Sequence, residues 1–270
     1  MSGRVEKIAV IGAGRMGHGI AQVAAMAGYA VKLMDIDLGA LERALNKIRW
    51  SLGKLANKGV IDVNEIERIL GKIRISTEVT EAVKDVDLVI ESVPEDFEIK
   101  KKVLAEIDKS SPQHTIISTN TSTIPITELA SATSRSDKFI GIHFFNPPQL
   151  VKLVEIIPGE TTSEETMRIA KEFVKSLKKE VLICRKDLPA FIVNRILFPI
   201  LDEAAWMVKR GEAEMAEIDS AIKYRVGLPM GPFELMDYIG LDVVYSAMRE
   251  VKKRDPKLIL LCPLIKEYYE

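Results

Sequence analysis

Two residues of this chain have the types and the spacing of an acid–base pair. His143 lies at the end of the apolar run Phe139–Phe144. Glu155 comes twelve residues later, inside a second apolar run, Leu153–Ile157. A carboxylate buried among apolar residues is costly unless a donor pairs with it, and His143 is the obvious candidate. Such a pair would fix the imidazole tautomer and raise its basicity, which suits it to take a proton from an alcohol during oxidation. The alternatives are a histidine satisfied in the core and a glutamate that faces solvent on an edge strand.

Short polar side chains follow another apolar run. Asn120 and Ser122 come directly after Thr115–Thr119. If that run is a strand, these side chains stand where a substrate and its cofactor meet. Alternatively, Ser122 or Thr123 caps a short helix after Pro125.

A glycine-rich segment follows the first apolar run of the chain. Its six residues are Gly12, Ala13, Gly14, Arg15, Met16 and Gly17. Gly12 permits a tight turn, Gly14 lets the main chain approach a pyrophosphate, and Gly17 lets the next helix pack closely on a sheet. The start of that helix directs free N–H groups and the positive end of its dipole at phosphates. The segment therefore predicts a dinucleotide site.

An acid, Asp35, closes the next apolar run, Ala30–Asp35. It follows Gly17 by eighteen positions, close to the roughly 20 expected for the acid that binds the adenosine ribose. Its carboxylate would repel a 2′-phosphate, so we predict NAD rather than NADP as the cofactor. The alternative is that the glycines only shape a corner and that Asp35 caps the next helix.

Apolar runs that alternate with helical patterns predict the elements that must position these residues. The expected strands of the first part are Lys7–Ile11, Ala30–Asp35, Ile73–Ser76, Asp87–Ser92, Thr115–Thr119, Phe139–Phe144, Leu153–Ile157 and Val181–Cys184, with a helix at Ser163–Leu177 before the last. This alternation predicts an α/β fold with a Rossmann-type, doubly wound parallel sheet. Active sites on such sheets lie at the carboxyl ends of the strands.

From Phe191 onward every periodic stretch is helical. We therefore expect two domains, a dinucleotide-binding domain over residues 1–187 and an all-α domain over residues 188–270. Asn194 is polar among apolar neighbours in the first helix of the second domain, where it is a candidate donor to a substrate or a structural residue. The final stretch Leu258–Cys262 is expected to leave apolar surface in need of a partner.

A charged helical region, Leu38–Leu70, broken near Asn57–Gly59, lies between the second and third strands. Its polar face includes Ser51 and Lys58. A solvated surface is one interpretation of this face, and a grip on an anionic substrate is another.

Composition indicates an ordinary globular protein of 270 residues. Lys and Arg number 38 against 39 Asp and Glu, so the net charge of −1 predicts no nucleic acid and no acidic membrane as partner. Cys184 and Cys262 are too few and too far apart for a disulfide framework or a zinc site, and a reducing cytoplasm is the expected location. We expect no metal, signal peptide or membrane span.

Six motifs in order make the chain recognisable. They are Gly12–Gly17, Ser118–Ser122, His143–Pro147, Leu153–Glu155, Phe191–Arg195 and Pro229–Leu235. Together they closely resemble the L-3-hydroxyacyl-CoA dehydrogenase family, which includes 3-hydroxybutyryl-CoA dehydrogenases. The resemblance spans nearly the whole chain and implies NAD-dependent interconversion of (S)-3-hydroxyacyl-CoA and 3-oxoacyl-CoA, in fatty-acid β-oxidation or butanoate metabolism.

The resemblance also implies roles for individual residues. His143 would be the general base and Glu155 its orienting partner, while Ser122 and Asn194 would bind the reacting oxygen or thioester. Cofactor contacts are implied for the Gly12–Gly17 segment and for Asp35, Glu95, Lys100, Asn120, Ser122 and Asn146. Contacts with the CoA part of the substrate are implied for Ser51, Lys58 and Ser122, which favours the second interpretation of the charged helical region.

The chain departs from the family pattern in two places. Ala190 stands where the family usually has glycine, which we expect to be a minor steric change. The chain ends at Glu270, before the terminal segment of the family, so we expect a natural short form or part of a longer polypeptide such as a fused hydratase–dehydrogenase. Family members dimerise through the helical domain, so a homodimer is expected. Dehydrogenation of a free hydroxy acid or sugar acid, or a non-catalytic NAD-binding role, are the alternative functions.

Overall fold

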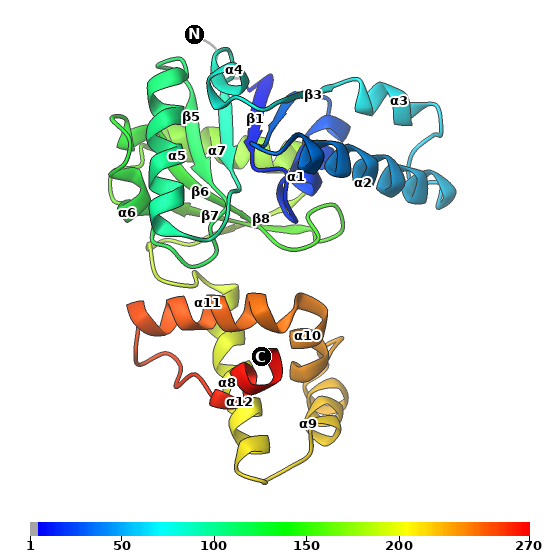
Figure 1. Cartoon of the computed structure of the whole chain (residues 1–270), viewed down its shortest axis with the longest axis vertical. Helices are drawn as coiled ribbons and strands as arrows, with labels where there is room; N and C mark the ends of the chain where they lie inside the picture. Colours follow the sequence, from blue (N-terminus) through cyan, green and yellow to red (C-terminus); the bar gives the residue numbers. More distant parts are fainter. Residues whose placement is uncertain (1–4) are drawn as a thin grey trace. The chain divides into compact units, whose positions relative to one another are not determined.

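The computed structural model describes residues 5–270, which form two compact units (Figure 1). The first unit contains the chain up to Thr121 together with Pro125–Asp187. The second contains Ser122–Ile124 and Leu188–Glu270. The short segment Ser122–Ile124 thus groups with the second unit, although the residues on both sides of it belong to the first.

The first unit is built on one sheet of eight strands in the order β3-β2-β1-β4-β5-β6-β7-β8. The strands are β1 (Lys7–Ile11), β2 (Ala30–Met34), β3 (Ile73–Ser76), β4 (Leu88–Glu91), β5 (Ile116–Thr119), β6 (Phe139–Phe144), β7 (Leu153–Pro158) and β8 (Glu180–Ile183). The doubly wound α/β fold is therefore confirmed, with every predicted strand end within one residue of the observed one.

The sheet is mixed, whereas the sequence predicts a parallel one. Neighbouring strands pair in parallel except β6 and β7, which are antiparallel. The cause is the connection between them: only residues 145–152 separate the two strands, and a parallel crossover needs about a dozen residues or more.

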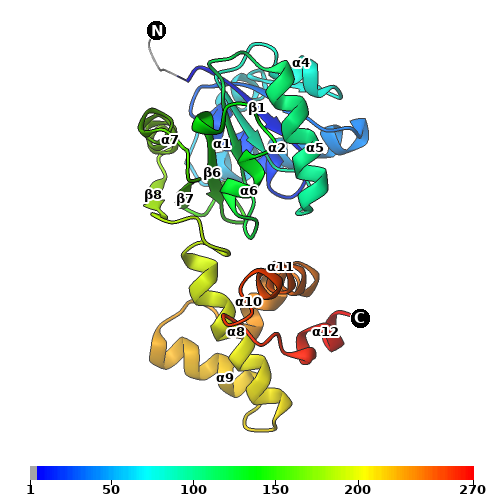
Figure 2. The same ribbon diagram turned by 90° about the vertical axis from the view of Figure 1, so that its left-hand side faces the viewer.

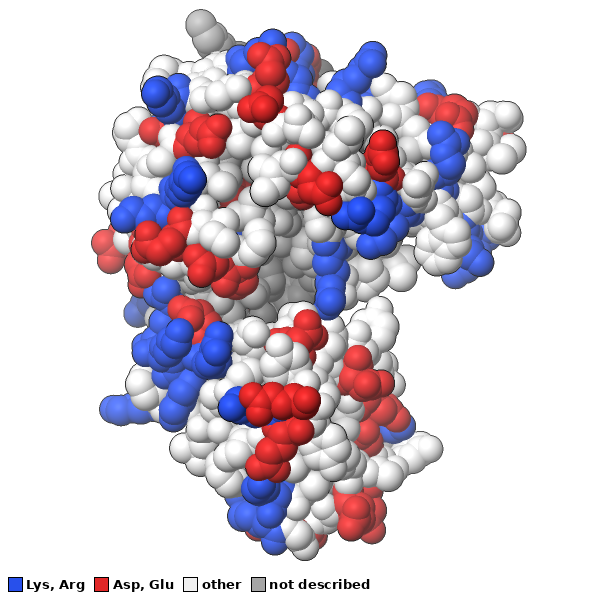
Figure 3. All heavy atoms as spheres, viewed as in Figure 1, with Lys and Arg blue, Asp and Glu red and all other residues white. Residues whose placement is uncertain are grey.

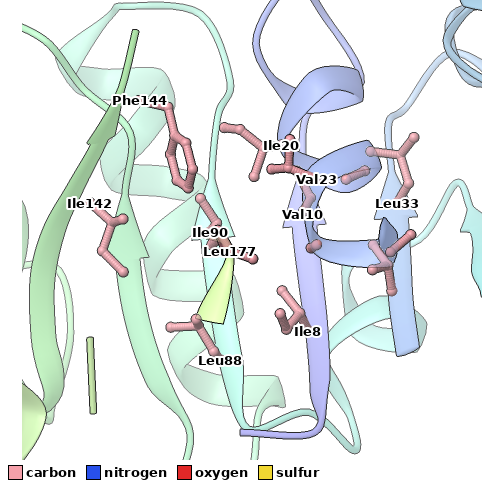
Figure 4. Packing of buried hydrophobic residues seen from close by; sticks show 14 of the residues in the cluster. Ile8, Val10, Ile20, Val23, Leu33, Leu88, Ile90, Ile142, Phe144 and Leu177 are labelled. Carbon is pink, nitrogen blue, oxygen red and sulfur yellow. The ribbon is translucent and has the colours of Figure 1, made fainter. Parts of the chain in front are cut away.

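Helices cover both faces of this sheet, and Figure 2 shows α7 on one side with α5 and α6 on the other. The helices of the first unit are α1 (Gly17–Met26), α2 (Leu38–Asn57), α3 (Glu65–Leu70), α4 (Val79–Val83), α5 (Phe97–Ser110), α6 (Ile126–Ala130), the 3-10 turn η1 (Ser136–Lys138) and α7 (Glu164–Ser176). Alternate residues of the strands, such as Ile8, Val10, Ile90 and Ile142, share one buried cluster with α1, α2 and α7 (Figure 4). The break predicted near Asn57–Gly59 is confirmed as the end of α2.

The second unit is helical and has its own buried cluster. Its elements are α8 (Val193–Lys209), α9 (Met215–Ala221), a π-helical turn η2 (Ile222–Val226), α10 (Pro232–Ile239), α11 (Leu241–Arg254) and α12 (Pro263–Tyr269). The all-α character of this part is therefore confirmed.

The stretch Leu258–Cys262 is only partly exposed. Ile259 and Cys262 are 3% and 0% exposed and pack within the second unit, whereas Leu260 is 68% exposed and supplies apolar surface as predicted. The Asp202 carboxylate accepts hydrogen bonds from the N–H groups of Leu260 and Cys262, both at 2.7 Å. Only Leu260 of these three residues projects outward. The sequence pattern missed this because the apolar stretch is not periodic, and the buried aspartate that holds it lies on α8.

Alanine at position 190 has a greater energetic cost than the minor steric change that was expected. Ala190 has a φ of 66° and is fully buried. A residue with a Cβ atom in this left-handed region costs roughly 1–2 kcal/mol, which glycine avoids.

Charged side chains of both signs are interspersed on the face of the first unit drawn in Figure 3. Within residues 5–270, no helix is both long and apolar enough to cross a membrane. Cys184 and Cys262 are both buried, and the two are not joined by a disulfide.

Candidate active site

His143 and Glu155 face each other across the antiparallel strands β6 and β7. They are register partners, and 2.7 Å separates His143 Nδ1 from Glu155 Oε2. Glu155 is 0% exposed and His143 is 5% exposed. Because an ionised carboxylate only accepts hydrogen bonds, His143 Nδ1 is the donor in this contact. The alternative of a solvent-facing glutamate on an edge strand is wrong, since β8 lies beyond β7.

The surroundings of the imidazole hold it in place. The rings of His143 and Phe145 pack with their centroids 4.6 Å apart. Asn120 Oδ1 accepts a hydrogen bond of 2.8 Å from the Phe144 N–H, and the Asn120 N–H donates to the Glu91 carbonyl at 2.8 Å. Asn120 therefore ties the ends of β4 and β6 together beside His143.

The glycine-rich segment joins β1 to α1 and has the shape that a dinucleotide loop requires. Gly12 has a φ of 101°, and a Cβ atom there would lie 2.4 Å from the Ser92 carbonyl oxygen. At Gly17 a Cβ atom would lie 1.8 Å from the Gly12 carbonyl oxygen. At Gly14, by contrast, a Cβ atom would meet nothing within 4 Å. The first and third glycines thus permit close packing, and the middle one borders open space that fits a pyrophosphate.

Asp35 follows β2 and is bound to this segment. Its Oδ2 accepts a hydrogen bond of 2.8 Å from the Ala13 N–H. The residue that caps α2 is Asp37, whose side chain accepts from the Gly39 N–H at 2.8 Å. The alternative interpretation of Asp35 as the helix cap is therefore wrong. Arg15 is exposed, and Met16, at the start of α1, makes no side-chain cap.

Lys100 is buried among protein acceptors, whereas a residue that contacts a ligand directly is expected to be accessible. It is 1% exposed on α5, and its Nζ lies 2.8 Å from Glu91 Oε1, 3.2 Å from the Val93 carbonyl oxygen and 3.3 Å from Glu95 Oε2. These are three acceptors for the three donors of an ammonium group. Burial alone lowers the pKa of Lys100, but the carboxylates of Glu91 and Glu95 outweigh burial and raise it.

Glu91 is a residue that the sequence reasoning missed. It ends β4 and is 0% exposed. The sequence feature that could have identified Glu91 is an acid at the end of an apolar run, here Leu88–Glu91. Asp35 and Glu155 were identified by the same kind of feature. Asp187 was also missed: its carboxylate accepts from the N–H groups of Ile126 and Thr127 at the start of α6. Asp187 therefore supplies the cap that the alternative interpretation assigned to Ser122 or Thr123.

The other residues with implied ligand contacts come from several different elements. Ser51 is on the buried side of α2, where its hydroxyl accepts a hydrogen bond of 3.0 Å from the Gln22 side chain. Lys58 follows the end of α2 and is exposed, as is Asn146 in the loop after β6. Ser122 and Asn194 both belong to the second unit, Asn194 in the first turn of α8. Roles for all five residues stay predictions.

Comparison with known proteins identifies the family. Residues 7–188 match the profile of the 3-hydroxyacyl-CoA dehydrogenase NAD binding domain, and residues 191–270 match that of the C-terminal domain of the same family. The chain is 41% identical to 3-hydroxybutyryl-CoA dehydrogenase of Bradyrhizobium diazoefficiens, over 100% of this chain and 92% of that one.

Two further relatives agree with this assignment. Mitochondrial hydroxyacyl-coenzyme A dehydrogenase of Sus scrofa is 42% identical over 93% of this chain and 82% of its own length. The crystal structure of (S)-3-hydroxybutyryl-CoA dehydrogenase from Ralstonia eutropha superposes with a TM-score of 0.91 at 37% identity, over 97% of this chain and 93% of that one. The family resemblance and the NAD cofactor predicted from the motifs are confirmed. The chain therefore belongs to the 3-hydroxyacyl-CoA dehydrogenase family, whose N-terminal domain binds NAD.

Proposed function

We propose that this protein interconverts (S)-3-hydroxyacyl-CoA and 3-oxoacyl-CoA, with NAD as its redox cofactor. The observation that carries the proposal is the buried pair of His143 and Glu155 at the carboxyl end of β6. The glycine-rich segment after β1, in the same sheet, supplies the dinucleotide site that such a reaction requires. The names of the similar proteins support the acyl-CoA substrate class.

In the oxidising direction, His143 is the general base. Its Nε2 accepts the proton of the substrate hydroxyl while the electrons of that O–H bond form the carbonyl and hydride leaves C3. Bound NAD supplies the nicotinamide ring that takes this hydride. Glu155 holds the Nδ1 proton, which keeps Nε2 as the basic atom, and its negative charge stabilises the imidazolium that forms. In the reducing direction the same imidazolium returns the proton to the carbonyl oxygen.

The remaining site residues position the two ligands. Gly12–Gly17 and the N-terminus of α1 would hold the pyrophosphate, with Asp35 on the adenosine ribose and Asn120, Ser122 and Asn146 toward the nicotinamide half. Ser122 and Asn194 would orient the reacting oxygen or the thioester. Ser51 and Lys58 would contact the CoA part of the substrate, Lys58 through its charge. These roles rest on the matching motif positions.

Turnover with matched substrates tests the proposal. We expect NADH oxidation with acetoacetyl-CoA to exceed that with free acetoacetate in kcat/KM by at least about a hundredfold, because the CoA contacts contribute to transition-state binding. Comparable rates with free acetoacetate or with sugar acids would favour the free-acid alternative. NADH binding without turnover on acyl-CoAs of any chain length would favour the non-catalytic alternative.

The cellular setting is a further part of the proposal. We assign the reaction to fatty-acid β-oxidation or butanoate metabolism in the cytoplasm, the reducing compartment in which cysteines usually stay as thiols. Assembly as a homodimer through the helical unit is expected from the family resemblance. The mass of the purified protein in solution tests that assembly.

A further inference from the structure

The carboxylate of Glu91 collects donors from three different segments. Its Oε1 accepts hydrogen bonds from Lys100 Nζ at 2.8 Å and from the Val93 N–H at 2.7 Å. Its Oε2 accepts from the Thr119 hydroxyl at 2.6 Å. Glu91 is fully buried, so these three bonds to the carboxylate replace the water that an ionised carboxylate requires.

These contacts close into a ring of polar groups. The Thr121 N–H donates to Thr119 Oγ1 at 3.2 Å, and the Thr121 hydroxyl donates to Glu95 Oε1 at 2.6 Å. Glu95 Oε2 lies 3.3 Å from Lys100 Nζ, which returns to Glu91. We call Glu91, Glu95, Lys100, Thr119 and Thr121 the Glu91 network. It joins the segment after β4 to the segment after β5.

The Glu91 network lies directly beside the glycine-rich segment. Glu91 is the register partner of Ile11 on β1 and of Thr119 on β5. The next residue, Ser92, is the one whose carbonyl oxygen excludes a side chain from Gly12. Side chains alternate between the faces of a strand, and Ile90 points into the cluster shared with α1, so Glu91 points to the opposite face. Ile142 and Phe144 are in that same cluster, which puts His143 on the face of Glu91.

We infer that Glu91 is a positioning residue for the cofactor: its buried ion pair with Lys100 fixes Glu95 and the start of the Asn120–Thr121 segment where the nicotinamide half of NAD is to bind. This inference rests on the proposed cofactor site. In it, Lys100 acts through Glu91 and Glu95, because its three donors already have protein acceptors, and Glu95 is the member of the network that reaches solvent, with a 33% exposed side chain.

The charge of Glu91 is the property that matters in this arrangement. With a neutral amide at position 91, the Lys100 ammonium would depend on Glu95 alone for a counter-charge. Glu95 would then be drawn away from the Thr121 hydroxyl toward Lys100, and its orientation toward a ligand would change.

The test is the affinity for NADH, measured by fluorescence titration without substrate, together with thermal unfolding. We expect Glu91→Gln to raise the Kd of NADH about tenfold, to raise the KM for NADH similarly, and to leave kcat at saturating NADH within about threefold because the His143–Glu155 pair is intact. Glu81→Gln is the matched control, since it removes the charge of an exposed glutamate paired with Lys84 and should leave the Kd unchanged.

A second variant separates positioning from folding stability. Glu91→Gln combined with Lys100→Met removes both buried charges, and such replacements often restore stability. The inference predicts that this double variant recovers the Tm while its Kd for NADH stays raised about tenfold. Recovery of the Kd together with the Tm would overturn the inference, and so would a Glu91→Gln protein that binds NADH like the wild type.

If Glu91→Gln fails to fold, Thr121→Val replaces it. This change keeps the shape of the side chain and the buried ion pair but removes the hydroxyl that donates to Glu95 Oε1, so the Kd should still rise, by about threefold. Thr133→Val, which removes a hydroxyl bonded to the Ala130 carbonyl, is its control. An unchanged Kd in Thr121→Val would then overturn the inference. A wild-type protein that binds NADH without reducing acetoacetyl-CoA would instead remove the proposed function and leave this inference standing.

Discussion

His143 on β6 and Glu155 on β7 are directly opposite each other because the two strands run antiparallel. Residues at opposite positions of an antiparallel pair project from the same face, with Cβ atoms about 4.5–5.5 Å apart. A connection of residues 145–152 is therefore enough to bring the carboxylate to the imidazole, inside a sheet that excludes water from Glu155. The reversal of strand direction is the feature of the fold that creates the pair.

Replacement of His143 tests the base. We expect His143→Gln to lower kcat with acetoacetyl-CoA by about 10²–10⁴-fold, the usual contribution of a positioned acid–base group. The Kd for NADH should change little. His114→Gln is the control, because His114 is an exposed imidazole that contacts Asp87. Near-normal turnover in His143→Gln would remove the proposed base.

Replacement of Glu155 tests its orienting role. Glu155→Gln keeps the size of the side chain but removes the charge that stabilises an imidazolium, and its amide group also permits the wrong tautomer. We expect kcat to fall about a hundredfold or more, with KM for NADH nearly unchanged. A variant with wild-type kcat would show that the buried contact serves only the packing of the sheet.

Asp35 is expected to set the preference for NAD. Asp35→Ser removes the charge that repels a 2′-phosphate and weakens the contact with the Ala13 N–H. The ratio of kcat/KM for NADH to that for NADPH should fall about tenfold or more. Asp37→Ala, which removes the α2 cap, controls for local destabilisation. The prediction fails if the ratio is the same in both variants.

Asp108 makes folding stability depend on pH. Burial alone would raise its pKa, but hydrogen bonds from Ser134 and the Arg135 guanidinium outweigh burial and lower the pKa below its usual 3.8. A depressed pKa in the folded state stabilises the protein above the unfolded value and loses that effect as the pH falls. Asp108→Asn should therefore cost about 2 kcal/mol of unfolding free energy at neutral pH. In urea unfolding, this difference should shrink as the pH falls below about 4; a constant difference would contradict it.

Lys178 offers a stabilising substitution. It follows the end of α7, is exposed, and has a φ of 57°. Lys178→Gly should raise the free energy of unfolding by about 0.5–1 kcal/mol, since relief of the left-handed strain exceeds the entropy that glycine adds to the unfolded chain. Calorimetry should show a Tm rise of about 1–4 °C. Lys175→Gly, an exposed change inside α7, should lower the Tm instead, and a fall in both would contradict the argument.

The periodicity of apolar residues and the spacing of motifs predicted most of the strands and helices and part of the candidate site. Apolar runs of strand length mark each strand to within one residue, because burial on both faces requires continuous apolar sequence in a covered sheet. The glycine-rich segment and Asp35 are likewise local features, whose spacing along one β-α-β unit is enough to predict a dinucleotide site. A histidine and a glutamate in apolar runs predict a pair because each needs the other's hydrogen bond.

Tertiary structure decided what depends on residues distant in sequence. The capping of α6 by Asp187 and the burial of Ile259 and Cys262 both arise from contacts between residues far apart in the chain. The Glu91 network belongs here too: Glu91, Lys100 and Thr119 come from a strand, a helix and a neighbouring strand, and only strand order brings them together. Sequence alone therefore determined which chemistry the chain is built for. The three-dimensional packing decided which side chains come into contact at the site. Hydrogen bonds and ion pairs require the two groups to be close in space, and this closeness does not depend on how far apart the residues are in the sequence.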